Sequence, residues 1–160
     1  HFQNNYIAYA IGGQMMGKIL PLQQMIDLCT RISKPIVLLG SVEDRARGDQ
    51  VVKACGNSVF NACGAFSLNQ SASLIQQAHK VISHDTGLMH IATALGRPVI
   101  SLWFATTPAL GFSPWQAVAG SRMIEADCPK RPTSKLGNRG YEDGCVFNID
   151  LASVARVAAE

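Results

Sequence analysis

The stretch KVISHDTGLMHIATALGRPVISLW, residues 80–103, decides the fold. Residues 80–83 form a short strand with apolar Val81 and Ile82 at its centre, and residues 87–95 have the pattern of a helix that stops at Gly96. Residues 98–103 form a second apolar run. Two strands joined by a helix run parallel in one sheet, because the crossover returns the chain to the edge where it started.

The same alternation extends outward from this stretch in both directions. On the N-terminal side we expect strands at 6–11, 35–39 and 59–61 and helices at 20–33, 44–55 and 67–78, with Ser67 capping the last of these. Beyond residue 103 the chain is rich in Gly, Pro, Ser and Thr, with one strand expected at 122–125 and a closing helix at 150–160, capped by Asp150. The pattern predicts an α/β fold with a Rossmann-like, doubly wound parallel sheet.

Composition narrows the class of protein further. Hydrophobic residues make up 48% of the 160 residues and charged residues 16%, which predicts one globular domain. The net charge of +3 is too small to indicate nucleic-acid binding. No apolar run reaches the roughly 18–20 residues of a membrane span. The low content of charge also fits a domain whose surface is partly covered by another domain.

The five cysteines are odd in number and widely spaced, without a C-x-x-C pair or a nearby histidine. This pattern argues against a zinc site and predicts reduced thiols in an intracellular protein. Cys128 and Cys145 bracket the segment 129–144, and the sequence leaves open whether they pair. That segment carries Lys130, Arg131, Lys135 and Arg139, which either form a solvated loop or reach phosphate groups.

The turn after the expected strand at 80–83 holds the first candidate site. In parallel sheets, ligands bind beyond the carboxyl ends of the strands, where free N–H groups of a following helix attract phosphate. Asp85, Thr86 and Gly87 occupy this turn, and His90 follows in the first helical turn. The alternative interpretation is that Asp85 or Thr86 only caps the helix.

The turn after the first strand, residues 12–19, nearly matches the phosphate-binding loop G-x-x-x-x-G-K-[ST]. Ile19 replaces the hydroxyl residue that would hold magnesium, and Pro21 places the helix start after the lysine. The turn is better interpreted as a glycine-containing loop that presents Lys18 toward the sheet edge. A P-loop-like NTPase and a merely solvated lysine are the alternatives.

Three stretches resemble glycosyltransferase family nine, the ADP-heptose:lipopolysaccharide heptosyltransferases. They are residues 81–98, which contain the D-T-G-x-x-H motif, together with residues 64–68 and 18–21. The resemblance implies a GT-B architecture of two Rossmann-like domains facing a cleft. Residues 1–160 would form the C-terminal, nucleotide-sugar-binding domain, and the N-terminal acceptor domain would lie outside this sequence.

The resemblance also implies roles around the diphosphate of the donor. Thr86, Gly87 and Lys18 would hold the diphosphate, and Asp85 would contact sugar hydroxyls. His90 would lie against the donor near the helix N-terminus. Lys18 and His90 would stabilise the leaving group, which makes them the candidate catalytic residues of this domain.

Other residues would contact the nucleoside. Glu43 or Asp44 follows the second strand where the family binds the ribose, and the sequence does not choose between them. Phe66 stands where the family packs an apolar residue on adenine, although ordinary core packing explains it equally well. The turn at residues 104–108 differs from the family, because Phe104 replaces a common glycine.

The function implied is inverting transfer of heptose, or a related sugar, from an ADP-sugar to a lipopolysaccharide core acceptor. No metal or other cofactor is expected, and the general base would come from the N-terminal domain, so the isolated domain should be inactive. The expected location is cytoplasmic, with the full-length protein peripheral to the inner membrane. Two alternatives to this function remain, the P-loop-like NTPase and a nonenzymatic nucleotide-sugar binding module.

Overall fold

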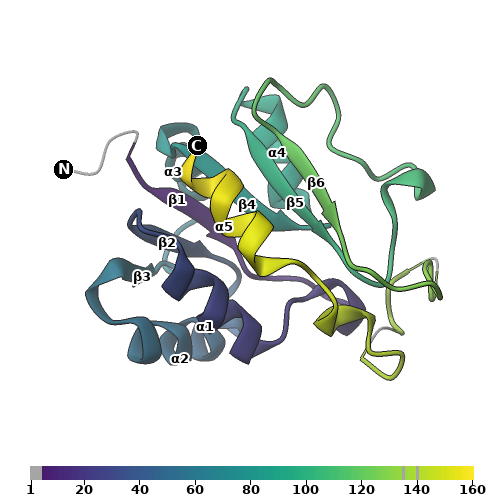
Figure 1. Cartoon of the computed structure of the whole chain (residues 1–160). Coiled ribbons are helices and arrows are strands. Elements are labelled where there is room, and N and C mark those ends of the chain that lie inside the picture. Colours follow the sequence, from purple (N-terminus) through teal and green to yellow (C-terminus); the bar gives the residue numbers. More distant parts are fainter. Residues whose placement is uncertain (1–4, 135, 140) are drawn as a thin grey trace.

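The computed structural model describes residues 5–134, 136–139 and 141–160, and its centre is a six-stranded parallel sheet (Figure 1). The strands lie in the order β3-β2-β1-β4-β5-β6. Their bounds are β1 Ile7–Ala10, β2 Ile36–Leu39, β3 Val59–Asn61, β4 Lys80–His84, β5 Val99–Trp103 and β6 Arg122–Glu125. The predicted strands, including the one after residue 120, are all present.

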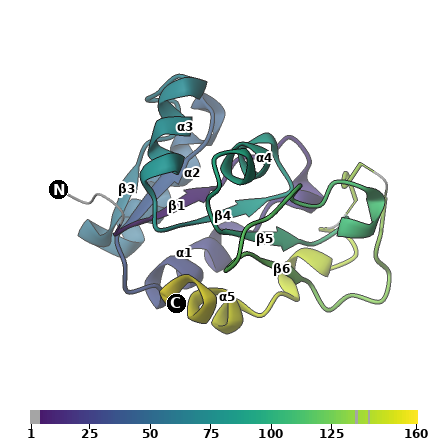
Figure 2. The same cartoon turned by 90° about the horizontal axis from the view of Figure 1, so that it is seen from above.

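Helices cover both faces of this sheet. They are α1 Leu22–Arg31, α2 Arg45–Cys55, α3 Leu68–Gln77, α4 Gly87–Ala94 and α5 Leu151–Ala159. One face packs against α3 and α4, and the opposite face packs against α1, α2 and α5. Figure 2 looks along the sheet and shows α4 on one side and α1 and α5 on the other. The predicted doubly wound parallel α/β fold is confirmed.

Strand β1 shows how the two faces arise from the sequence. Its successive side chains point to opposite sides, so Ile7 and Tyr9 enter the core beneath α1 and α5 while Ala8 enters the core beneath α3 and α4. All four residues of β1 are buried. Strands covered on both faces have continuous apolar runs, which is the pattern that predicted them.

The helix ends follow local rules that are visible in the sequence. Ser67 Oγ accepts a hydrogen bond from Gln70 N at the start of α3, and Asp150 Oδ1 accepts one from Ser153 N at the start of α5. Gly56 follows α2 with φ of 69°, a conformation that glycine adopts without a Cβ clash. Both predicted caps are confirmed.

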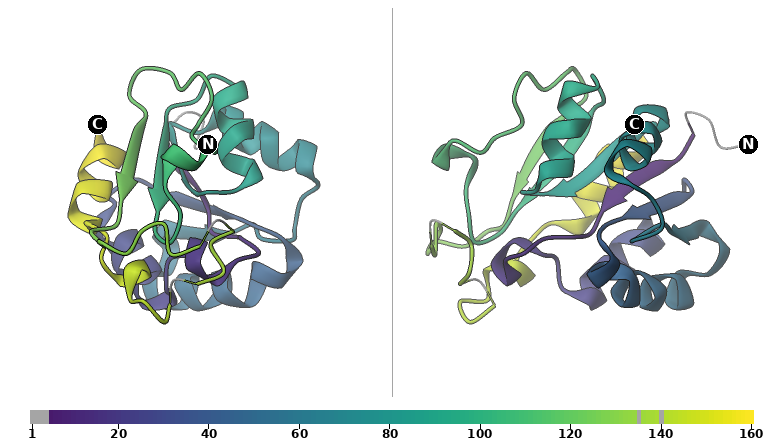
Figure 3. Two further views of the ribbon diagram at one scale, coloured as in Figure 1. Left: turned by 90° about the vertical axis from the view of Figure 1, so that its right-hand side faces the viewer. Right: turned by 180° about the vertical axis from the view of Figure 1, so that it is seen from behind.

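The order of the strands reverses between β1 and β4, so the connections that follow these two strands leave toward opposite faces and open a crevice. Segments distant in sequence meet at this end. Ala105 N donates to Gly17 O at 3.0 Å, and Thr133 N donates to Ala105 O at 2.9 Å. Figure 3 shows the segments after β1, β5 and β6 gathered at this end of the sheet.

Within the described residues, no helix combines the length and the apolar character needed to cross a membrane.

Candidate functional site

A cavity of about 1150 Å³ lies at the carboxyl ends of β1 and β4. Its walls come from the turns after β1, β2 and β4, from the start of α4 and from the segment before α3. All of the site residues predicted from the sequence except His90 line it, namely Lys18, Glu43, Asp44, Phe66, Asp85, Thr86 and Gly87. Residues from four separate turns therefore converge at the place where parallel sheets bind ligands.

An ion pair links two of these turns. Lys18 Nζ lies 2.6 Å from Asp85 Oδ2, and the side chains are 18% and 6% exposed. Thr106 Oγ1 donates to the same carboxylate oxygen at 3.2 Å, and Lys18 Nζ lies 5.5 Å from the centre of the Phe112 ring. The interpretation of Lys18 as a solvated lysine is wrong, because a carboxylate and an aromatic ring hold its ammonium group at the cavity.

The turn after β4 leaves the start of α4 open to a ligand. Thr86 is the N-cap residue, yet its side chain makes no capping bond, and its Oγ1 lies 3.3 Å from Ser83 Oγ. Asp85 turns its carboxylate to Lys18 and Thr106. Thr86 occupies the N-cap position predicted by the alternative interpretation, but within the described residues neither its side chain nor that of Asp85 makes a capping bond to α4. No heavy atom lies within 4 Å of the Cβ position at Gly87 among the described residues. A ligand can therefore approach the first-turn N–H groups, which carry partial positive charge.

The loop around Lys18 does not have the geometry of a P-loop. Met16–Lys18 form a short 3₁₀ turn, η1, and α1 begins only at Leu22. Ile19 is extended and only 3% exposed, so its side chain belongs to the core. In a P-loop the helix begins at the lysine, and the next hydroxyl residue faces a magnesium ion. Neither condition is met here.

Glu43 and Asp44 differ in what their carboxylates contact. Asp44 Oδ2 accepts bonds from Ser41 N and Ser41 Oγ, both at 2.9 Å, and its Oδ1 lies 3.3 Å from Arg47 Nη1. Asp44 is 7% exposed, whereas Glu43 is fully exposed at the cavity wall. The polar groups of this turn, first the Ser41 side chain and then the Glu43 backbone, lower the pKa of Glu43, so this carboxylate stays ionised.

Two aromatic residues that the sequence left ambiguous are placed differently by the fold. Phe66 is 42% exposed and lines the cavity near Leu68, so the core-packing alternative is wrong for it. Phe104 is 1% exposed, and its ring lies edge-on to the ring of His84 with centroids 5.8 Å apart. The residue that replaces the family's glycine is thus directed into the core.

His90 does not line the cavity, and its side chain is exposed. Gly87, Leu88 and Ile91 form the cavity-facing side of α4. A helix advances roughly 100° per residue, so His90 lies about a quarter-turn away from the middle of that side. Gly87 and His90 lie about 60° apart on the helix, as their spacing predicted, but Gly87 lines the cavity and His90 does not.

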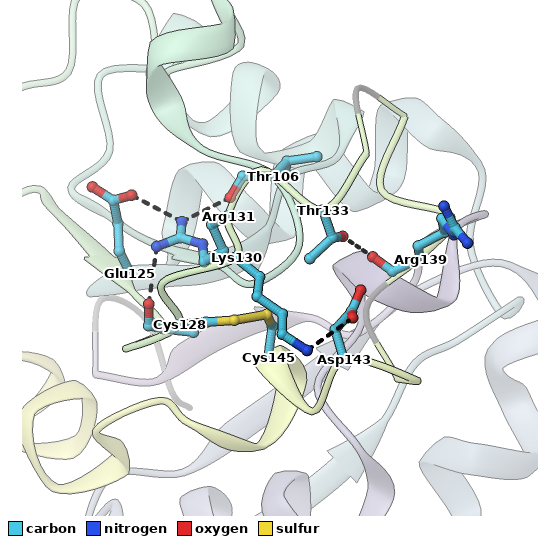
Figure 4. The surroundings of a disulfide bond; sticks show 10 residues. Thr106, Glu125, Cys128, Lys130, Arg131, Thr133, Arg139, Asp143 and Cys145 are labelled. Carbon is cyan, nitrogen blue, oxygen red and sulfur yellow. Dashed lines mark hydrogen bonds and ion pairs between the residues drawn. A yellow bond between two sulfur atoms is a disulfide. The ribbon is translucent and has the colours of Figure 1, made fainter.

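The segment between β6 and α5 is closed by a disulfide bond between Cys128 and Cys145 (Figure 4). Their Cα atoms are 5.3 Å apart, although the residues are 17 positions apart in sequence. The prediction of reduced thiols is wrong for this pair, because spacing along the chain does not show that the fold brings the two residues together. Cys29, Cys55 and Cys63 are free.

The basic residues between Cys128 and Cys145 differ in burial and in the groups that they contact. Arg131 is turned inward, and its side chain is 8% exposed. Its guanidinium group donates to Thr106 O at 2.7 Å and to Ala126 O at 2.9 Å. The same group forms an ion pair with Glu125 at 2.8 Å (Figure 4). Lys130 is 69% exposed and lies 3.5 Å from Asp143.

The solvated-loop interpretation therefore fits Lys130 and is wrong for Arg131. Arg139 is exposed, and its carbonyl oxygen accepts a bond from Thr133 Oγ1. Lys135 lies outside the described residues.

His84 is a buried polar residue that the sequence did not single out. It ends β4 directly before Asp85 and is 0% exposed. Burial lowers the pKa of its ring to about 4, so the ring is neutral near pH 7. The available signal was a histidine at the end of a buried strand, which does not reveal its partners.

In the described part of the chain, no group of three or more His, Cys, Asp or Glu side chains is arranged to hold a metal ion.

Comparison with known proteins decides the family. The model of glycosyltransferase family 9 (heptosyltransferase) matches residues 23–136. The chain belongs to this family. The predicted resemblance is thereby confirmed, and it places the chain among glycosyltransferases.

Individual family 9 relatives match part of their own length only. Lipooligosaccharide heptosyltransferase 2 of Haemophilus influenzae is 35% identical over 77 residues, which cover 46% of this chain and 22% of that protein. Lipopolysaccharide heptosyltransferase 2 of Escherichia coli is 32% identical over 77 residues, which again cover 46% of this chain and 22% of that protein. The solved structure of the E. coli ADP-heptose LPS heptosyltransferase II has the same fold, with a TM-score of 0.80 and 22% identity over 98% of this chain and 46% of that one. This family 9 chain thus spans about half of that solved structure.

Proposed function

We propose that this chain is the nucleotide-sugar-binding domain of an inverting heptosyltransferase, which uses ADP-heptose or a related ADP-sugar. The observation that carries the proposal is the cavity at the switch point of a family 9 fold, where Lys18 faces the open N-terminus of α4. Two of the most similar relatives are named heptosyltransferases, and the name of the solved E. coli structure includes ADP-heptose.

The donor diphosphate binds at the start of α4 in this proposal. The N–H groups of the first turn and the Thr86 hydroxyl donate to phosphate oxygens, and Gly87 allows the backbone to approach them. Lys18 lies at the same cavity and adds a full positive charge. The ammonium group is already held by Asp85, so little side-chain entropy is lost when phosphate binds.

Asp85 faces the sugar in this arrangement. A carboxylate beside a diphosphate repels it unless a cation lies between them, and Lys18 is positioned to be that cation. The free lone pairs of Asp85 can accept hydrogen bonds from sugar hydroxyls. Thr106 and Lys18 fix the orientation of this carboxylate before the donor arrives.

The nucleoside extends toward the turn after β2. Glu43 accepts from the ribose hydroxyls, because its carboxylate is exposed at the cavity and ionised. Asp44 serves a structural role, since Ser41 and Arg47 occupy its oxygens. Phe66 offers an exposed aromatic face on which adenine stacks.

The reaction itself is a displacement at the anomeric carbon. A hydroxyl oxygen of the lipopolysaccharide core acceptor forms a bond to this carbon while the bond to the diphosphate oxygen breaks, and the configuration inverts. Negative charge develops on the leaving ADP, where Lys18 and the α4 N-terminus stabilise it. The base that takes the acceptor proton, and the acceptor site, come from an N-terminal domain in the GT-B arrangement. The assembled enzyme works at the cytoplasmic side of the inner membrane.

Calorimetric titration of the chain with ADP and UDP in EDTA tests this proposal. We expect ADP to bind more tightly than UDP without metal, because adenine has a larger aromatic surface than uracil to stack on the exposed ring of Phe66. Lys18→Ala should weaken ADP binding by about 1–3 kcal/mol, since a charge-assisted contact to phosphate is lost. Lys53→Ala is the matched control, because Lys53 is an exposed lysine outside the cavity.

Unchanged ADP affinity in Lys18→Ala would remove the diphosphate assignment. Binding that requires magnesium would favour an NTPase instead. ADP binding together with a lack of sugar transfer by the complete two-domain protein would favour a nonenzymatic binding module.

A further inference from the structure

Buried His84 contacts two backbone groups that flank the loop of Lys18. Its Nδ1 lies 3.4 Å from Gly12 O, and its Nε2 lies 3.3 Å from Leu20 N and 3.3 Å from Tyr9 Oη. The backbone N–H of Leu20 can only donate, so Nε2 is the acceptor and Nδ1 carries the proton that is donated to Gly12 O. One neutral tautomer therefore satisfies both ends of the loop at once.

The loop between these two contacts carries the cation of the site. Gly12 follows β1, Leu20 precedes α1, and Lys18 ends the only 3₁₀ turn between them in the described chain. On the opposite side Gly17 O accepts from Ala105 N. The contacts of His84 with Gly12 O and Leu20 N hold the two ends of the loop, and the bond from Ala105 N to Gly17 O holds its middle. These three contacts fix the backbone position from which the Lys18 side chain reaches the cavity.

The ring of His84 is itself held rigidly. It lies edge-on to Tyr9 and Phe104, with centroid distances of 5.7 and 5.8 Å. It is 0% exposed and is not part of the cavity wall. The ligand therefore does not touch His84, and any effect of this residue on binding must pass through the groups it holds.

We propose that His84 is a positioning residue, which anchors the Gly12–Leu20 loop so that Lys18 meets the diphosphate of the donor. This role rests on the proposed function of the cavity. It predicts that the loss of the ring weakens binding of a nucleoside diphosphate, because Lys18 no longer starts from a fixed backbone. Binding of the nucleoside part should not change, since Phe66 and Glu43 lie on other segments.

A double-mutant cycle on the 160-residue chain tests the role. We would titrate ADP and adenosine into the wild type, His84→Phe, Lys18→Ala and the double variant, after checking each fold by circular dichroism. His84→Phe should weaken ADP binding about tenfold, equivalent to 1.4 kcal/mol, and leave adenosine unchanged. In the Lys18→Ala background the same substitution should have no further effect. Tyr9→Phe is the matched control, because it removes a bond to His84 that does not involve the loop.

Each outcome is decisive. Equal weakening of ADP and adenosine, or additive effects in the cycle, would overturn the role of His84 while leaving the donor site intact. Failure of the wild type to bind ADP would overturn the proposed function and this role together. A nitrogen-15 NMR spectrum of the wild-type histidines provides a test even if His84→Phe does not fold. We expect His84 to be protonated at Nδ1, and protonation at Nε2 would contradict the anchoring bonds.

Discussion

Residues 6–103 and residues 104–149 are organised by different means. The first region contains five strands and four helices, whose caps and apolar faces are set by neighbouring residues. The described residues of the second contain one strand, β6, and short 3₁₀ turns. It is held by the Cys128–Cys145 disulfide, by Arg131 and by main-chain bonds to distant segments. The comparison teaches that local signals set the helix caps and apolar faces of the first region, whereas a few long-range contacts hold the second region in place. Loss of one of these long-range contacts should therefore cost more than loss of one local helix cap.

Arg131 offers the largest expected effect. Arg131→Met should reduce the free energy of unfolding by about 3–4 kcal/mol, because two carbonyl oxygens and a carboxylate lose a nearly buried cation. Urea denaturation measures this change. Lys130→Met is the control and should cost less than about 0.5 kcal/mol, since its ion pair is exposed. Equal costs would show that the segment does not depend on Arg131.

The disulfide should have an effect of similar size. The Cys128→Ser/Cys145→Ser variant should lose about 3 kcal/mol of stability, because the bond closes a loop with a sequence separation of 17 residues. The fall in melting temperature measures the loss. A reducing agent should lower the melting temperature of the wild type to that of the variant and leave the variant unchanged. A wild type insensitive to reduction would contradict the contribution of this bond.

Acid should weaken the buried polar contacts that His84 makes within the first region. Burial lowers the pKa of His84 to about 4 from an ordinary value of 6.5, so the unfolded chain takes up this proton first. The contribution is therefore complete above about pH 6.5 and is lost as the pH falls toward 4, to an extent of about 3 kcal/mol. The stability difference between the wild type and His84→Phe should shrink accordingly in urea titrations between pH 7 and 4.5. Parallel stability curves would show that His84 is not buried and neutral.

The cap of α3 should give the smallest effect, in the locally determined region. Ser67→Ala should cost about 1 kcal/mol, because Gln70 N loses its acceptor. Thermal unfolding measures the change. Ser73→Ala, an exposed serine within the same helix, should cost less. A loss at Ser67 as large as that at Arg131 would remove the contrast between the two regions.

Much of the fold followed from the sequence because its signals are local. The apolar run at residues 35–39 and the cap at Ser67 can be recognised without knowing which segments meet in space. The candidate turn at Asp85, Thr86 and Gly87 was also predictable, since the position of a ligand site follows from parallel topology. Comparison with known proteins then confirmed the family that this turn suggested.

The remainder depends on distant partners and could not be predicted. Arg131 lies in a polar segment like Lys130, yet its side chain turns inward because the carbonyl groups of Thr106 and Ala126 face it. Glu43 and Asp44 are neighbours, and only the fold shows that Ser41 and Arg47 engage Asp44. Helical spacing placed His90 beside Gly87 without showing that the cavity lining does not include it.

A crystal structure of the chain with ADP, grown without divalent metal, tests the central claim most directly. We predict phosphate oxygens within hydrogen-bonding distance of Lys18 Nζ and the Gly87 backbone N–H, the ribose at Glu43 and adenine on Phe66. ADP bound elsewhere, or with its diphosphate remote from Lys18 and the start of α4, would contradict the assignment of this cavity as the donor site.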